Sequence, residues 1–535
     1  MSKRHIRIEW SSAGFVLLFA AVCVLVQIAT GAYWTDRGLS NDEAAHFVNS
    51  LLVFDYIANG IPSDPLGYAR EYYLHFPRVS IGHWPPVFYV MEAGLFGLCG
   101  RSAAVAIASE AAMAALVLGW VASLVRRRAG WLTGLATGVA ALASPGLMAQ
   151  LDQVMTDLFL ALWLLGAALA WAAFAVRPSV GRVAVFAACA IGAIMTKGDG
   201  FLLALLPPLH AALTRDGGAL LDRRTWLAVV AIGIASLPWY LLTYRMAATG
   251  FNYAWGWDYT LKSLPAFIGL LVEGIGMIGA AGLLAAAIGI VRPRRGLPDH
   301  PLAALVGLVV AAVLFHAIVP ADIAARYMIS VVPAAMIAAA IGLMGLLGPL
   351  AGRLRVPCGM IVAALLLIDA ASIVRLPLVR PFGAEAVAAM IMQAESANPL
   401  VLVAGSGRAE GALIAAFAEA DRARRFFVLR GTQVLSSSTF MGEQYALRFA
   451  DPASLEGWLA DAGIGWLVVD DSPAGMGMQH NRQVLATAAG APAGWKLVDT
   501  HRTADGEMRL YQLSSTMPSA TQMRNALQRV RPSTQ

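Results

Sequence analysis

Long apolar segments recur along most of the sequence, and they restrict what the chain can fold into more than any other feature. A helix needs about 20 apolar residues to cross a bilayer. Backbone groups in lipid must be satisfied within the spanning segment, which favours helices. Candidate spans lie at about 13–32, 102–125, 130–147, 154–176, 182–196, 200–214, 225–244, 266–291, 301–319, 327–348 and 357–374. The sequence therefore predicts an α-helical polytopic membrane protein with about 11 transmembrane helices.

Composition supports this class, since 58% of the 535 residues are hydrophobic and 13% are charged, against about 25% charged in soluble domains. The net charge of +6 comes from short clusters of Lys and Arg between apolar runs, so no nucleic-acid partner is expected. The four cysteines lie in or beside apolar segments without a CxxC spacing, which predicts neither a metal site nor a disulfide framework.

The distribution of basic residues predicts the topology. The first apolar run is too long for the core of a cleaved signal peptide and is expected to remain as the first helix. Every second connection is basic, as is the N-terminal segment with Lys3, Arg4 and Arg7; the basic connections hold Arg126 to Arg128, Arg177, Arg182, Arg215, Arg223, Arg224, Arg292, Arg294, Arg295, Arg353 and Arg355. Basic loops stay in the cytoplasm. The N-terminus is therefore expected to be cytoplasmic, and the region after an odd number of spans extracytoplasmic.

The chain is expected to divide into a transmembrane domain, 1–374, and an extracytoplasmic α/β domain with a polar tail, 375–535. Predicted strands alternate with predicted helices in the second part, at Leu400–Val403, Gly411–Ala420, Arg425–Leu429, Ser454–Ala462 and Trp466–Asp470. This alternation indicates a largely parallel sheet, and the polar tail is placed after Ser514. Gly405-Ser406-Gly407 follows the first strand, but Glu410 occupies the position of a third glycine, so nucleotide binding is not expected.

The first outer connection, 34–100, carries chemistry as well as structure. Phe47–Phe54 and Pro85–Leu98 are too short to span and are expected to lie in the membrane interface. Asp42 and Glu43 stand next to the end of the first helix, where ionisable residues are candidates for function. A loop acid or a helix cap is the alternative for this pair. His83 belongs to a His-Trp-Pro-Pro run whose aromatic residues suit the headgroup layer.

Further polar groups fall at the same predicted ends of the helices, namely Asp157, Lys197 with Asp199, and Arg326 with Tyr327. Each alone is compatible with a helix cap or a snorkelling side chain. Together with Asp42 they predict a site with both signs of charge at the outer membrane surface.

The residues just named give the sequence a resemblance to a known family. The Asp42-Glu43 pair, His83-Trp84-Pro85-Pro86, Asp157, Thr196-Lys197-Gly198 and Arg326-Tyr327 with Pro333 resemble, in order and spacing, the bacterial branch of the C-type (GT-C fold) membrane glycosyltransferases. That group includes dolichyl-phosphate-mannose protein mannosyltransferases and the lipid A aminoarabinose transferase. The resemblance covers about residues 10 to 350. Trp84 stands where lipid A transferases commonly have a lysine, which argues against a lipid A acceptor and an aminoarabinose donor.

The resemblance implies an inverting sugar transfer from a polyprenyl-phosphate donor to an extracytoplasmic lipid, glycan or protein acceptor in the bacterial inner (plasma) membrane. It also implies that Asp42 is the base. Glu43 is expected to orient an acceptor, a basic side chain or a cation. Lys197 and Arg326, with His83 as an auxiliary donor, suit the carrier phosphate. Asp157 is expected to support Lys197, and Tyr327 to pack against sugar or lipid.

Two further questions stay open from the sequence. No cofactor is firmly predicted, although Asp42, Glu43 and Asp157 have oxygens suited to a divalent cation. A polytopic transporter or lipid-linked sugar flippase is the alternative class, but it predicts internal repeats and polar residues near the middle of the membrane, which the sequence does not clearly show. A non-catalytic subunit is a third reading.

Overall fold

The computed structural model describes residues 10–80, 82–250, 254–292, 299–377, 381, 383–438, 444–490, 494–502 and 506–530. The predicted topology signals Lys3, Arg4, Arg7, Arg294 and Arg295 lie outside the described residues.

Every predicted span contains helix. The spans correspond to α1 (Trp10–Thr30), α5 (Ala103–Ala129), α6 (Trp131–Leu142) with α7 (Pro145–Leu151), α8 (Asp157–Val176), α9 (Val180–Ile194), η2 (Gly198–Ala204) with α10 (Leu206–Thr214), α12 (Arg223–Gly250), α13 (Trp257–Val291), α14 (His300–Ile318), α16 (Val332–Leu354) and α17 (Cys358–Ile373). Among the described residues, seven of these helices are long and apolar enough to cross a membrane, or eight if the pair α6 and α7, bent by 73°, is one span. The chain is thus a multi-pass membrane protein, and its remaining apolar helices are shorter than a full span.

Small residues let the longest helices approach each other closely. A Cβ atom at Gly342 of α16 would lie 2.0 Å from the carbonyl oxygen of Gly282 in α13. Such contacts are the usual basis of helix packing in lipid, where burial of apolar side chains gains little. The glycine pair therefore fixes α13 against α16.

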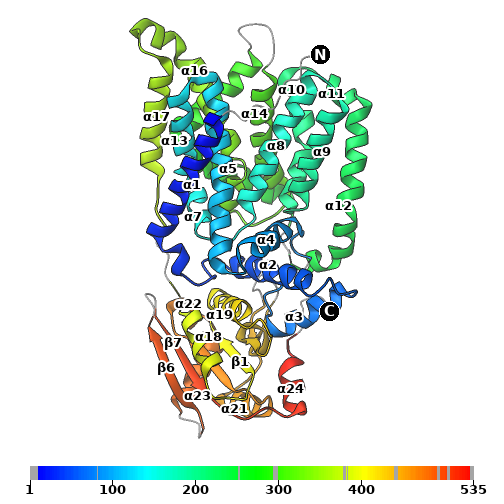
Figure 1. Cartoon of the computed structure of the whole chain (residues 1–535), viewed down its shortest axis with the longest axis vertical. Coiled ribbons are helices and arrows are strands. Elements are labelled where there is room, and N and C mark those ends of the chain that lie inside the picture. Colours follow the sequence, from blue (N-terminus) through cyan, green and yellow to red (C-terminus); the bar gives the residue numbers. More distant parts are fainter. Residues whose placement is uncertain are drawn as a thin grey trace.

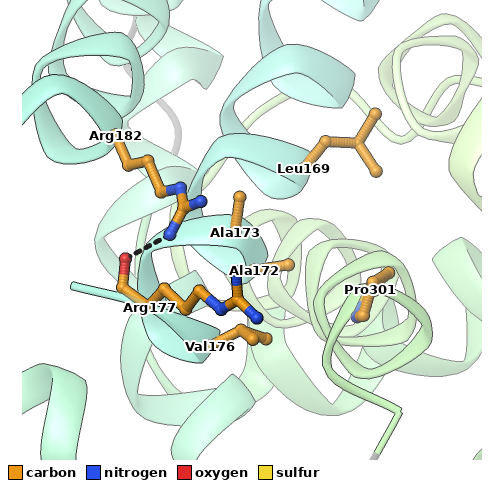
Figure 2. Close-up of a pocket in the computed structure, with 7 residues that line it drawn as sticks. All are labelled: Leu169, Ala172, Ala173, Val176, Arg177, Arg182 and Pro301. Atoms are coloured by element: carbon orange, nitrogen blue, oxygen red, sulfur yellow. Dashed lines mark hydrogen bonds between the residues drawn. The ribbon is translucent and has the colours of Figure 1, made fainter. Parts of the chain in front are cut away.

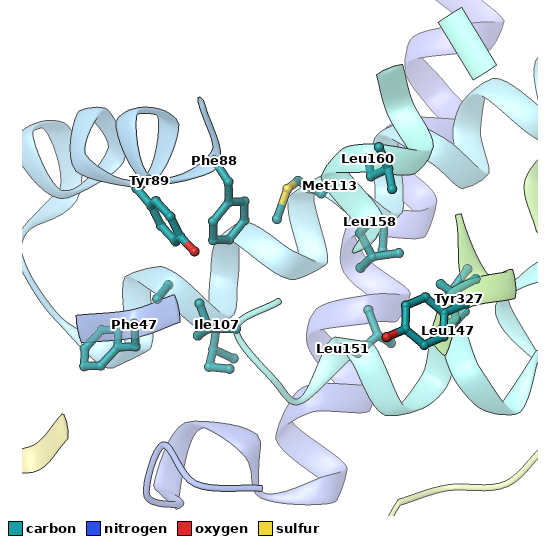
Figure 3. Close-up of a cluster of buried hydrophobic side chains, with 14 of the residues drawn as sticks. Phe47, Phe88, Tyr89, Ile107, Met113, Leu147, Leu151, Leu158, Leu160 and Tyr327 are labelled. Atoms are coloured by element: carbon teal, nitrogen blue, oxygen red, sulfur yellow. The ribbon is translucent and has the colours of Figure 1, made fainter. Parts of the chain in front are cut away.

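A platform of three helices joins the spans to the rest of the molecule (Figure 1). It consists of α2 (Glu43–Ala58), α3 (Pro65–His75) and α4 (Val87–Cys99). Figure 3 shows part of the apolar cluster in which side chains of α2 and α4 meet those of α5, α7 and α8. Helix α3 was not expected; it begins with Pro65 at its first position, and the Asp64 side chain accepts a hydrogen bond from the Gly67 amide.

The C-terminal α/β region contains a mixed sheet in the order β2-β1-β5-β7-β6. Strands β1 (Leu400–Ala404), β2 (Phe427–Arg430) and β5 (Trp466–Asp470) are parallel, as predicted. Strands β6 (Lys496–Arg502) and β7 (Glu507–Gln512) are antiparallel, which corrects the prediction of a largely parallel sheet. Strand β6 is mostly polar and has no buried residue, and β7 largely alternates polar with apolar residues, so neither presents the continuous apolar run of a fully buried strand.

The helices of this region are α18 (Ala384–Gln393), α19 (Gly407–Ala420), α21 (Pro452–Asp461), α23 (Gln479–Ala489) and α24 (Ala520–Leu527), with short turns α20 (Gly431–Val434) and α22 (Pro473–Met476) and a small ribbon of β3 (Ser436–Ser437) and β4 (Ala446–Leu447). The predicted polar tail is therefore partly helical, since Ser519 and Gln522 form a capping box that starts α24.

Helix α19 packs directly on the platform. A Cβ at Gly411 would lie 2.9 Å from the Cβ of Ala44 in α2, so this contact requires glycine. Arg101 holds the other end of α19 by donating to the carbonyl oxygens of Ala418 and Glu419, at 2.7 and 2.6 Å. The α/β region thus lies against the end of the bundle opposite the start of α1 (Figure 1).

Candidate active site

A cavity of about 1820 Å³ lies where the membrane helices, the platform and the α/β region meet. Its lining includes the predicted site residues Asp42, His83, Lys197, Arg326 and Tyr327. Residues far apart in the sequence are thereby gathered in one space at the end of the bundle.

Asp42 is the N-cap residue of α2, and its carboxylate forms an ion pair with the guanidinium of Arg326. Burial alone would raise the pKa of Asp42, but Arg326, His46 and Lys197 outweigh it and hold the pKa below the usual 3.8. Burial disfavours the charge of Arg326, yet Asp42 raises the pKa of the arginine. Both groups are therefore charged at neutral pH, and both face the cavity.

Lys197 occupies the turn between α9 and η2. Its ammonium nitrogen lies 2.7 Å from Asp157 Oδ1 and 3.1 Å from Asp199 Oδ2. Despite burial, these carboxylates raise the pKa of Lys197, so the ammonium stays charged. The predicted contact between Asp157 and Lys197 is thus present, with Asp157 buried behind the lysine.

The ring of Tyr327 lies close to both cations. The ring centroid lies 5.0 Å from Lys197 Nζ and 5.2 Å from Arg326 Cζ. A ring face at this distance attracts both charges, so Tyr327 keeps the lysine and the arginine at one edge of the cavity.

His46 also lines the cavity, although sequence reasoning assigned it no role. Its Nδ1 lies 2.8 Å from the Tyr89 hydroxyl oxygen, and its ring packs on Trp84 with centroids 4.5 Å apart. Burial lowers the pKa of His46 to about 3, so the ring is neutral at neutral pH. The sequence signal for His46 is its position four residues after Asp42, because residues at i and i+4 share one face of a helix.

His83 lies in the same cavity. Burial lowers the pKa of His83, and Asp42 partly offsets this. The histidine is therefore neutral at pH 7, so one of its two ring nitrogens donates a hydrogen bond and the other accepts one.

Glu43 turns away from the cavity and is fully buried. Its carboxylate accepts hydrogen bonds from the Leu39 amide at 2.7 Å and from Arg37 Nη1 at 3.3 Å. These bonds fix the loop before α2. Of the three expected options for Glu43, orientation of a basic side chain is the one that these contacts match.

The carboxylates considered for a divalent cation do not converge. Asp42 contacts Arg326, Glu43 contacts Arg37, and Asp157 contacts Lys197. Within the ranges that the structure describes, no group of three or more His, Cys, Asp and Glu side chains has a metal-binding arrangement. The described residues therefore do not fit a cation held by these three acids.

A second, smaller cavity of about 350 Å³ lies at the opposite end of α8 (Figure 2). Its lining is apolar apart from Arg177 and Arg182, and Arg182 donates to the carbonyl oxygen of Arg177 at 2.6 Å. A helix of the length of α8 spans about 30 Å, so this cavity is remote from Asp42. Its lining offers no carboxylate for acid–base chemistry.

The chain shares the fold of the C-type membrane glycosyltransferases, since solved structures of that fold match it over most of its length. The resemblance predicted from the sequence is thus confirmed at the level of the fold. Neither a family model nor a curated protein sequence matches the chain.

Solved structures of at least two proteins share this fold. ArnT, the lipid A aminoarabinose transferase, from Cupriavidus metallidurans in the apo state is 18% identical, with a TM-score of 0.57 over 94% of this chain and 98% of ArnT. The same ArnT bound to undecaprenyl phosphate has a TM-score of 0.58. The oligosaccharyltransferase from Archaeoglobus fulgidus, in complex with Zn and sulfate, is 14% identical, with a TM-score of 0.56 over 94% of this chain and 73% of its own.

Proposed function

We propose that the protein transfers a sugar from a polyprenyl-phosphate donor to an extracytoplasmic acceptor, with inversion at the anomeric carbon. The observation that carries this proposal is that an ionised carboxylate, Asp42, and two cations, Lys197 and Arg326, line one cavity at the end of the helix bundle. Such a transfer needs a base for the acceptor hydroxyl and positive charge for the departing phosphate.

The donor phosphate binds at Lys197 and Arg326. Both are charged, and an arginine fork suits phosphate oxygens. The ArnT structure bound to undecaprenyl phosphate supports a lipid phosphate as the carrier for this fold. His83 is an auxiliary hydrogen-bond donor, and Tyr327 aligns the two cations and packs against the sugar or the lipid. The transferred sugar is a hexose or a pentose.

Phosphate binding prepares the base. Arg326 contacts Asp42 in the structure, and a phosphate competes for the same guanidinium. As Arg326 turns to the phosphate, Asp42 loses part of the attraction that lowers its pKa and becomes a stronger base. The carboxylate then accepts the proton of the acceptor hydroxyl.

The displacement takes place in one step. The acceptor oxygen forms a bond to the anomeric carbon, the bond from that carbon to the phosphate oxygen breaks, and its electron pair leaves with the carrier phosphate. The proton moves to Asp42. A single displacement inverts the anomeric configuration. Asp157 and Asp199 position Lys197, and Glu43 positions the loop that carries Asp42.

We also propose a location and a domain division. The protein lies in the inner membrane of a bacterium. The cavity lined by Asp42 and the α/β region are on the extracytoplasmic side, and the N-terminus is in the cytoplasm. The division falls between α17 and α18, so that 1–374 form the transferase domain and 375–535 the α/β domain. The acceptor is a lipid, a cell-surface glycan or a protein.

Sugar release from a panel of polyprenyl-phosphate sugars tests the function. We expect the purified wild type to consume one donor when a crude acceptor extract is present, and Asp42→Asn to lose at least a hundredfold in rate, since the amide cannot accept the proton. Asp258→Asn is the matched control, because Asp258 is an exposed acid near the start of α13 that does not line the cavity.

Equal rates for wild type and Asp42→Asn would exclude Asp42 as the base. If no donor is consumed by any variant, the transferase proposal fails. Flux of labelled polyprenyl-phosphate sugar across proteoliposomes would then test the flippase alternative.

A further inference from the structure

The platform and the α/β region give the cavity a strongly basic wall. Six arginines line this wall, namely Arg70, Arg78, Arg408, Arg430, Arg448 and Arg529. Among the described residues of the lining, the carboxylates are Asp42 at the start of platform helix α2 and Asp199 and Asp322 of the membrane part, and the α/β region contributes none. The two ends of the cavity therefore differ in net charge.

Three of the arginines have a structural use. Arg430 pairs with the buried carboxylate of Glu410, 3.1 Å away. Arg78 donates to the carbonyl oxygen of Gly407, and Arg408 donates to that of Gly38 at 3.0 Å. The contacts of Arg78 and Arg408 join the α/β region to the platform and to the loop before α2, whereas the Arg430–Glu410 pair lies within the α/β region.

Arg448 and Arg529 differ from these three. Arg448 Nε donates to the carbonyl oxygens of Gln433 and Ser436, at 3.2 and 2.9 Å. The Arg529 guanidinium stacks over Phe449 and Trp458, 5.0 and 4.9 Å from the ring centroids. In the part of the chain that the structure describes, neither forms an ion pair with a carboxylate. Each side chain is thus oriented by neutral groups while its charge is left for another partner.

The two guanidinium groups are also close enough to affect each other. Burial lowers the pKa of Arg529, and the charge of Arg448 lowers it further. Holding like charges together is unfavourable unless an anion lies between or beside them. Arginine pairs arranged in this way typically bind phosphate or carboxylate groups by charge-assisted hydrogen bonds.

Neutral hydrogen-bonding groups surround the pair. The lining nearby contains Gln433, Ser436, Ser437, Tyr445 and Gln479. Hydroxyl and amide groups of this kind match the hydroxyl groups of a sugar or another polar scaffold. The wall is therefore suited to a polar molecule that carries an anionic group.

We propose that the acceptor bears phosphate or carboxylate groups and that Arg448 and Arg529 bind them, which orients the acceptor hydroxyl toward Asp42. Identification of the bound anion as the acceptor rests on the proposed function. Binding of an anion at Arg448 and Arg529 does not. The carrier phosphate is the other anion that the cavity would take, and its cations, Lys197 and Arg326, belong to the membrane part.

Anion binding by the full-length protein in detergent tests the proposal. Tripolyphosphate represents a phosphate-bearing acceptor and trigalacturonate a carboxylate-bearing one, each titrated by calorimetry. We expect one of them to bind the wild type, and Arg448→Gln to weaken it at least tenfold, with Arg448→Lys in between because lysine keeps the charge without the fork. Arg529→Gln should act in the same way, and if loss of its stacking unfolds the protein, Arg448→Gln decides.

Arg524→Gln is the control, since Arg524 lies on α24 but does not line the cavity. Unchanged affinity in Arg448→Gln, or no binding of either anion to the wild type, would overturn the proposal. A separate titration with undecaprenyl phosphate identifies the source of the anion, because a loss in Arg448→Gln as large as that for tripolyphosphate would mean that the wall holds the carrier. These titrations need no donor turnover, so they fail or succeed independently of the Asp42→Asn test.

Discussion

Asp42 and Arg326 neutralise each other in the structure, so the basicity of the carboxylate depends on the arginine's other partners. In the proposed mechanism the base stays weak until an anion competes for Arg326, so that water meets a poorly reactive carboxylate in the absence of donor.

The acid limb of the pH profile should show this dependence. With Arg326 in place the pKa of Asp42 lies below 3.8, so the carboxylate is ionised above that pH and activity falls only as the pH drops through the lowered value. Arg326→Gln removes the main opposing charge, and burial then raises the pKa of Asp42. We expect the acid limb of kcat/KM to move to higher pH in addition to a large loss of rate.

The control is Arg326→Lys, which retains the charge and should keep the limb near its wild-type position. A rate loss in Arg326→Gln with the shape of the profile unchanged would contradict this account of Asp42.

Single residues were predictable to different degrees. Asp42, Lys197 and Arg326 stand out in the sequence because a charge beside a span needs a reason. His46 does not stand out, since a histidine inside a partly apolar helix most often packs in a core, and only the fold brings Tyr89 and Trp84 to it. Adjacent Asp42 and Glu43 look equivalent in sequence, yet one faces the cavity and the other is buried under Arg37.

At the scale of elements, the spans are predictable because lipid imposes both their length and their hydrogen bonding. The elements that were missed are short and only partly apolar, as in α3 and α24, or depend on pairing with a distant strand. Strands β6 and β7 are an example, because β7 is fixed by its antiparallel register with β5, in which Val468 pairs with Leu510. A half-buried pair of strands carries little signal of its own.

Helix contact at a glycine gives a test at this scale. Gly342→Ala would place a Cβ 2.0 Å from the Gly282 carbonyl oxygen, so α13 and α16 must separate. We expect a loss of about 1–3 kcal/mol in unfolding free energy, measured as a lower denaturation midpoint in detergent. Gly345→Ala on the same helix is the control, because a Cβ there meets nothing within 4 Å. Equal midpoints for the two variants would argue against close contact of these helices.

At the scale of the whole molecule, Arg101 links the membrane part to the α/β region. It pairs with Asp55 at 3.0 Å and donates to the last carbonyl groups of α19. Arg101→Gln leaves Asp55 without this partner, and breaking a buried pair commonly costs about 3–5 kcal/mol; we expect somewhat less here because Asp55 is partly exposed.

The measurement is hydrogen exchange of α19 amides, which should accelerate at least tenfold in Arg101→Gln. Arg422→Gln, an exposed arginine just after α19, should leave the exchange as in the wild type. Slow exchange in both variants would show that Arg101 does not hold the α/β region.

The loop before Asp42 is bound from the far end of the chain. Asp36 accepts hydrogen bonds from the amides of Gly383 and Glu385 at the start of α18, and Gly38 accepts one from Arg408 of α19. The α/β region is therefore not a modular attachment. Under the proposed function, a hybrid that took this region from a relative to gain a new acceptor would also inherit a different alignment of Asp42, so acceptor choice and catalytic rate would have to evolve together.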